Sequence, residues 1–227
     1  MPMFDIYFLL FCLPAMIAAA ACQIWVKSAY RKQSLVRNFR GMTGAQAAAA
    51  VLRHYGVSNV QIRPIAGSLT DHFDPRDNTI NLSQGVYGSA SVAAVGIACH
   101  EAGHAAQHAA GYIPIKIRNA ILPVSNIGSL AGVPLAILGF IMGFQPLVTI
   151  GLILFAMVAV FQLVTLPVEF NASRRAMRVI EEDGLLEGEE AQGARKVLTA
   201  AAMTYVAALA VSIANLLRLL VRMHRRS

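Results

Sequence analysis

The residues with the clearest chemical potential lie in Ala98–Ala109, which reads A-C-H-E-A-G-H-A-A-Q-H-A. On a helix, His100 and His104 lie one above the other on the same face, so their imidazoles can bind a single metal ion. Zinc is the expected ion, and Glu101, one step round the helix, can reach a metal-bound water and take its proton. This H-E-x-x-H arrangement predicts a zinc hydrolase with Glu101 as its general base. The alternative is a helix whose histidines are only hydrogen-bonded in a polar cavity.

The segment around the motif is expected to form a helix over about Ser89–Ala110. No proline interrupts it, and its small residues would let it lie close against neighbouring elements. His108 falls about 80° round the helix from His100, and the position of a third histidine in the extended zincin pattern is Ala110, so we interpret His108 as a polar rim residue. Cys99 points away from His100 and is interpreted as a packing residue.

The composition indicates an integral membrane protein. The 227 residues are 56% hydrophobic and 14% charged, whereas soluble domains are about 45–50% apolar and about 25% charged. The net charge of +7 comes from basic residues beside apolar runs, so membrane topology and anionic lipid explain it better than nucleic acid does. The three cysteines predict no disulfide framework. We expect a mainly α, polytopic membrane protein.

Four apolar segments are long enough to cross a bilayer: Ile6–Val26, Pro123–Gly143, Leu147–Val168 and Leu198–Leu217. Basic residues follow the first segment instead of preceding it, so we predict an uncleaved anchor whose carboxyl end faces the cytoplasm. The second and third segments are joined by a very short connection and form a hairpin, which returns the chain to the side that carries His100.

The expected organisation has five parts. Residues 1–26 form the anchor, 27–122 a zincin-like cytoplasmic metalloprotease module, 123–168 the hairpin, 169–197 a second cytoplasmic segment and 198–227 the fourth span with a basic tail. If successive spans cross the membrane in opposite directions, this tail lies on the outer side of the membrane, against the positive-inside rule. Either the tail is translocated despite its charge, or the last helix is irregular.

Glu169 emerges from the hairpin on the side of the histidines and is the predicted third ligand, since two His and one Glu form a known catalytic zinc set. Ser173, one turn further, and Asn171 are candidates for orienting a ligand. The alternative for Glu169 is a solvated charge at a membrane exit. Its rivals as ligand lie in a charged stretch that we interpret as a solvated loop or amphipathic helix: Glu181, Glu182, Glu187, Glu189 and Glu190.

The soluble module should begin with a helix over Thr43–Tyr55, with Thr43 as N-cap. Two β-like runs follow, Asn59–Arg63 and Thr79–Leu82, separated by a turn-rich segment. Extended chain upstream of the motif suggests an edge strand to which a peptide could add, and a hairpin that only packs on the helix is equally compatible. His54 is interpreted as a surface residue near its helix end. Three residues are candidate oxyanion donors: His72, which we place in the turn, Tyr112 and Arg174.

Four strings together resemble the membrane zinc metallopeptidases of the YugP-like family: L-T-D-H-F-D-P-R (Leu69–Arg76), N-L-S (Asn81–Ser83), C-H-E-A-G-H-A-x-Q-H, and P-V-E-F-N-A-S-R-R-A (Pro167–Ala176). The resemblance covers nearly the whole chain and implies a neutral zinc metallopeptidase with His100 and His104 as ligands and Glu101 as base. The chain is also similar, more distantly, to HtpX-type and CAAX prenyl endopeptidases, whose third ligand opens an E-x-x-A-D motif. Glu169 and Ala172 match that motif, and Ser173 replaces its Asp.

These observations predict a metalloendopeptidase with one Zn²⁺ per chain, in a bacterial inner or plasma membrane, with the active site facing the cytoplasm. Its expected partners are the lipid bilayer and a polypeptide substrate, with membrane-protein partners or a homo-oligomer as further options and no nucleic acid. Two alternatives come from other classes: a catalytically silent zinc-binding scaffold, and a small transporter. The transporter predicts ionisable residues within the spans, and Pro123–Val168 contains none.

Overall fold

The computed structural model describes residues 6–224, and most of them are helical. Four helical stretches are long and apolar enough to cross a membrane: Phe8–Ser34, Ile113–Met142, Gln145–Glu182 and Gly188–Val221. A small three-stranded sheet accompanies them. The predicted class, a mainly α protein with four candidate membrane helices and a short β-element, is therefore confirmed.

The chain divides into two compact units. The apolar unit comprises Met1–Gln23, Pro114–Pro167 and Met203–Ser227, and the site unit comprises Ile24–Ile113 and Val168–Ala202. The helices α1 (Leu13–Ser34), α7 (Gln145–Glu182) and α8 (Gly188–His224) each contribute residues to both units.

Within the apolar unit, helices approach one another through glycine. A π-helical turn at Gly128–Gly132 joins α5 (Ile113–Ile127) to α6 (Val133–Met142). A Cβ atom placed on Gly128 would lie 2.1 Å from the carbonyl oxygen of Leu154, and one on Gly139 would lie 2.6 Å from the amide nitrogen of Val148, so both glycines permit backbone contact with α7. Small residues serve this purpose between membrane helices.

Helix α8 is continuous from Gly188 to His224, so the alternative of an irregular last helix is wrong. An unbroken helix is expected of this Ala- and Leu-rich sequence, which contains no proline. Arg225 and Arg226 of the basic tail lie outside the described residues. The sidedness of the tail stays a prediction.

The sheet of the site unit has the order β1-β3-β2. Strands β1 (Gln61–Ile65) and β3 (Thr79–Ser83) match the two predicted runs, but they pair in parallel, so the hairpin alternative is wrong. Strand β2 (His72–Asp74) was not predicted and pairs antiparallel with β3. Its three residues are too few to show alternation, and Pro75, Asp77 and Asn78 follow them as turn signals. His72 therefore lies in an edge strand and not in a turn.

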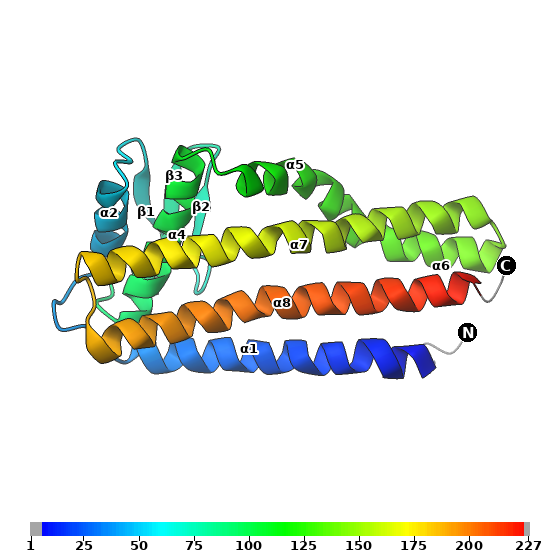
Figure 1. Ribbon diagram of the computed structural model, residues 1–227, viewed down its shortest axis with the longest axis horizontal. Coiled ribbons are helices and arrows are strands. Elements are labelled where there is room, and N and C mark those ends of the chain that lie inside the picture. Colours follow the sequence, from blue (N-terminus) through cyan, green and yellow to red (C-terminus); the bar gives the residue numbers. More distant parts are fainter. Residues whose placement is uncertain (1–5, 225–227) are drawn as a thin grey trace. The chain divides into compact units, whose positions relative to one another are not determined.

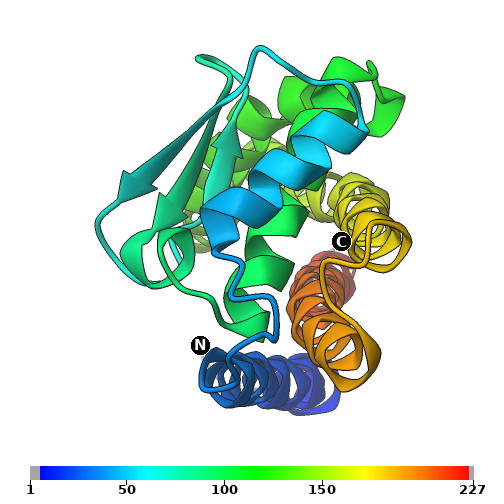
Figure 2. The same ribbon diagram turned by 90° about the vertical axis from the view of Figure 1, so that its left-hand side faces the viewer.

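Helices cover this sheet and form the core around α4 (Val92–Ala109). Helix α2 (Gly44–His54) begins with a capping box, in which the Gln46 amide donates to Thr43 Oγ1 and the Thr43 amide donates to Gln46 Oε1, so the predicted N-cap is confirmed. Figure 2 shows α2 in front of α4, with the strands beside both. Figure 1 labels the same elements, which surround a core that includes Val51, Ile80 and Val95.

The small residues of α4 allow its backbone to pack closely against α7 and α8. A Cβ atom on Gly103 would lie 2.7 Å from the carbonyl oxygen of Ala172 in α7. A Cβ atom on Gly96 would lie 3.2 Å from the Cβ atom of Ala194 in α8. Because Gly103 lies next to His104 and Ala172 lies close to Glu169, this contact fixes how far the two sets of side chains are from each other.

We predict that Gly103→Ala destabilises the protein by about 1–3 kcal/mol, because the added methyl group meets a carbonyl of the neighbouring helix, which cannot move as a side chain can. Thermal unfolding in detergent measures the change. Gly85→Ala in the short helix α3 (Gln84–Tyr87) is the matched control, since its Cβ would meet only the Tyr30 hydroxyl at 3.7 Å. Equal melting temperatures for the two variants would contradict the tight α4–α7 contact.

Candidate metal centre

Three potential ligand atoms converge where α4 faces α7. His100 Nε2 and His104 Nε2 are 3.2 Å apart, and Glu169 Oε2 lies 3.3 Å from the first and 3.7 Å from the second. Two ligands of a tetrahedral zinc, each bonded at about 2.1 Å, are separated by about 3.4 Å. The donor types and the spacing therefore both fit zinc. Among the side chains that the structure describes, no other group of three His, Cys, Asp or Glu residues meets as closely.

The surroundings of this cluster favour positive charge. Glu169 is 3% exposed and has no arginine or lysine as an ion-pair partner among the described contacts, only the two imidazoles. Burial by itself disfavours the protonated form of His104, but the contact with Glu169 and the negative charges of Glu101 and Glu169 outweigh it and raise the pKa of His104. The same negative potential would stabilise a divalent cation.

Gln107 orients His104, and the hydrogen bonds of the Gln107 amide determine which of its atoms faces the imidazole. The Gln107 side chain is fully buried, and its Nε2 donates to the carbonyl oxygen of Val168 at 2.8 Å and to Asn171 Oδ1 at 2.9 Å. Because Nε2 makes these two hydrogen bonds, the other atom of the amide, Gln107 Oε1, is the one that faces His104 Nδ1, at 3.0 Å. Gln107 Oε1 therefore accepts a hydrogen bond from His104 Nδ1, and His104 Nε2 is the ring nitrogen that faces Glu169 and would bind a metal.

Ser173 and Asn171, the two predicted orienting residues, both reach this network. The hydroxyl of Ser173 lies 3.1 Å from His100 Nδ1. Asn171 does not contact a histidine; its Oδ1 accepts from Gln107 and from Arg175 Nε, the latter at 2.9 Å. Sequence reasoning missed Gln107, although a single buried-face glutamine three residues after His104, in a helix otherwise rich in alanine, was an available signal.

Glu101 turns from the histidines towards strand β2. Its Oε2 accepts a hydrogen bond from the backbone amide of Phe73 at 3.1 Å. Because that amide is used by Glu101, it points away from β3 and lies on the free edge of the sheet. The edge of β2 therefore borders the metal centre, with the ring of Phe73 next to the ring of His108.

The other candidates lie apart from the ligand cluster. His72 donates through Nδ1 to the Thr70 carbonyl and accepts from Asn81, on the sheet face opposite Phe73. The hydroxyl of Tyr112 has no polar contact with the cluster among the described residues. Arg174 lines a cavity between α7 and α8.

The carboxylates that were rivals of Glu169 as the third ligand make surface contacts instead. Glu181 contacts Arg195, Glu182 contacts Arg178, Glu187 contacts Arg40 and Glu190 accepts from the Phe39 amide, while Glu189 is exposed.

Two residues that the sequence interpretation set aside lie away from the cluster. His54 contacts Asp183 at the end of α7. Cys99 is buried, and this burial raises the pKa of its thiol, so it remains a neutral packing residue.

We predict that Gln107→Leu lowers the affinity for zinc by roughly 10–100-fold, the usual effect of removing a partner that orients a metal-bound histidine. Leucine fills a similar volume but leaves His104 Nδ1 without an acceptor. Titration with a competing chelator measures the affinity, and Gln192→Leu, on the exposed face of α8, controls for a new surface leucine. A folded Gln107→Leu protein that binds zinc as tightly as the wild type would contradict the role assigned to Gln107.

Comparison with known proteins agrees with this geometry. Residues 8–224 match the family described as "Putative neutral zinc metallopeptidase". The chain is 43% identical over 206 residues to "Putative membrane protease YugP" of Bacillus subtilis (strain 168), an alignment that covers 89% of this chain and 92% of that protein. No solved structure matches the chain. A zinc peptidase requires a site such as the one that His100, His104 and Glu169 form, and the chain belongs to this zinc metallopeptidase family.

Proposed function

We propose that the protein is an integral-membrane zinc metalloendopeptidase that hydrolyses peptide bonds in membrane or membrane-proximal polypeptides. The observation that carries this proposal is the convergence of two imidazole nitrogens and one buried carboxylate oxygen, all within 4.8 Å of one another, directly beside a free strand edge. The first part supplies a metal site, and the second supplies a place for a peptide.

In this proposal His100, His104 and Glu169 hold one zinc ion per chain. When bound, zinc lowers the pKa of a water molecule and polarises a substrate carbonyl. Glu101 accepts the proton of the attacking water and passes it to the nitrogen of the leaving amine. Gln107 and Ser173 keep the two imidazoles oriented through these steps, because each holds the ring nitrogen that faces away from the ligand cluster.

The free edge of β2 is suited to a substrate in extended conformation. Phe73 is the residue of β2 whose amide points outwards, and a substrate carbonyl accepting from it would add the peptide as a further strand. The Phe73 amide would then leave Glu101, whose carboxylate becomes free to accept a proton. Substrate binding and activation of the base are thus connected by one hydrogen bond.

The membrane setting and the side on which the site lies follow from charge and apolar length. Most lysines and arginines flank the segments that carry the cluster, so the positive-inside rule places the active site on the cytoplasmic side of a bacterial plasma membrane. The lipid bilayer is a partner in this setting, and the substrate is a polypeptide. The oxyanion donor stays a prediction with three candidates, Tyr112, Arg174 and His72.

We predict that Glu101→Gln retains zinc and lowers the cleavage rate by at least about a hundredfold, because general acid–base catalysis contributes roughly 10²–10⁴-fold. The experiment compares purified wild-type and variant protein in detergent, by elemental analysis for zinc per chain and by digestion of an unfolded membrane protein. Glu189→Gln, an exposed residue of α8, is the matched control and should cleave at the wild-type rate.

Two results would contradict the proposal. Wild-type protein with zinc bound but no cleavage of any unfolded substrate would favour the silent scaffold. Cleavage by Glu101→Gln at the wild-type rate would show that a different group serves as the base.

A further inference from the structure

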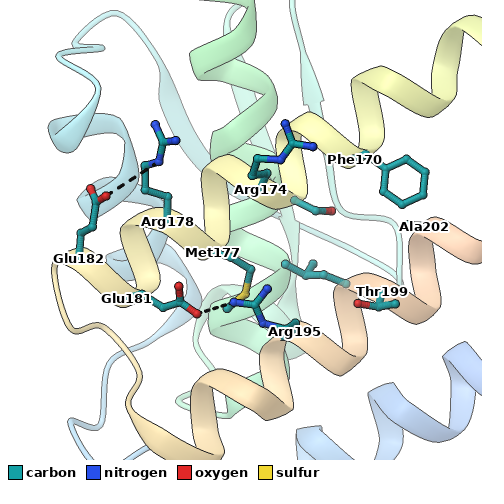
Figure 3. Close-up of a pocket in the computed structure, with 11 residues that line it drawn as sticks. Phe170, Arg174, Met177, Arg178, Glu181, Glu182, Arg195, Thr199 and Ala202 are labelled. Carbon is teal, nitrogen blue, oxygen red and sulfur yellow. Dashed lines mark hydrogen bonds and ion pairs between the residues drawn. The ribbon is translucent and has the colours of Figure 1, made fainter.

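A cavity of about 440 Å³ lies between α7 and α8, within the site unit and separate from the ligand cluster. This volume is within the range of small-molecule sites. Figure 3 shows its lining, which comes from one stretch of α7, from Phe170 to Glu182, and one stretch of α8, from Arg195 to Ala202. Ser173 lines the cavity as well as contacting His100, so the cavity shares a wall with the metal centre.

The lining changes from apolar to charged along the two helices. Phe170 and Ala202 line one end, close to the apolar stretches of α7 and α8. Phe170 is 41% exposed although it is a large apolar side chain. The other end, further from those apolar stretches, is lined by Arg178, Glu181, Glu182 and Arg195, and Arg174 lies between the two ends, one turn of α7 from Phe170. A ligand that fits this gradient has an apolar part directed towards the membrane and a charged part directed away from it.

The lining as a whole has an excess of positive charge. Arg195 pairs with Glu181 and Arg178 with Glu182, which leaves Arg174 as the third arginine. Figure 3 shows both pairs as dashed lines and the guanidinium of Arg174 apart from them. Arg174 has no hydrogen bond or ion pair among the described residues. An arginine fork with free donors binds phosphate oxygens well.

We propose that this cavity binds an anionic phospholipid of the leaflet next to the site unit, with the lipid phosphate on Arg174 and acyl-chain carbon on Phe170 and Ala202. The polarity gradient favours a lipid over a peptide carboxylate, because a peptide terminus would need the arginine but not an apolar end that adjoins the membrane-spanning stretches. The proposal does not depend on the protease activity, because a silent scaffold could bind the same lipid.

The test is retention of lipid by purified full-length protein in a neutral detergent, measured by native mass spectrometry after adding phosphatidylglycerol. Arg174→Gln should weaken retention about tenfold, the loss expected for a charge-assisted pair of hydrogen bonds. Lys196→Gln is the matched control, because it removes one positive charge from α8 as close to the apolar stretch as Arg174 is, but outside the cavity lining. It should retain lipid as the wild type does.

Two further probes identify the ligand class. Phosphatidylcholine should be retained less than phosphatidylglycerol, and inorganic phosphate should compete only at much higher concentration, because it lacks the apolar part. Arg174→Lys keeps the charge but not the fork, so its lipid retention should fall between that of the wild type and that of Arg174→Gln. Such a graded loss would show that Arg174→Gln weakens lipid binding itself and does not simply unfold the protein.

Three results would overturn the proposal: equal losses in Arg174→Gln and Lys196→Gln, equal retention of the two lipids, or inorganic phosphate that competes as well as the lipid does. Competition by a peptide carboxylate at similar concentration would assign the cavity to substrate instead. The readout is lipid binding, so loss of protease activity leaves it unaffected.

Discussion

The structure depends on a buried carboxylate that is held between two imidazoles. Glu169 is 3% exposed, and transfer of a carboxylate out of water costs several kcal/mol unless positive or polar partners compensate. Its partners come from a different helix, so α7 must lie against α4 closely enough for Glu169 to reach both histidines. Gly103 makes that approach possible, because its missing side chain is where the Ala172 carbonyl lies. A small residue in one helix thus sets the geometry of a site shared by two.

Around this carboxylate, hydrogen bonds connect both histidine ligands of α4 to α7, the helix that carries Glu169. Gln107 of α4 holds His104 and reaches across to Asn171 of α7, while Ser173 of α7 holds His100. Arg175 extends the network, since it donates to Asn171 and lies 5.3 Å above the ring of Tyr55 at the end of α2. The orientation of the imidazoles is therefore determined by the packing of three helices and not by the H-E-x-x-H motif alone.

The sequence allowed prediction of those features that depend on short-range pattern. Apolar length predicted the candidate membrane spans, Thr43 as N-cap predicted the start of α2, and motif spacing placed His100, Glu101 and His104 on one helix. Topology across the hairpin selected Glu169, and the structure brings it to the histidines. By contrast, β2 and the role of Gln107 arise from long-range contacts. A three-residue strand exists only because β3 pairs with it, and Gln107 is informative only once Val168 and Asn171 lie opposite it.

X-ray absorption at the zinc edge of zinc-loaded, purified protein tests the ligand set most directly. Two imidazoles and only nitrogen and oxygen scatterers at about 2.0–2.2 Å are the expected result, and Glu169→Ala should lose zinc or alter this first shell. A sulfur scatterer at about 2.3 Å, a third imidazole, or full zinc with an unchanged spectrum in Glu169→Ala would contradict a centre made by His100, His104 and Glu169.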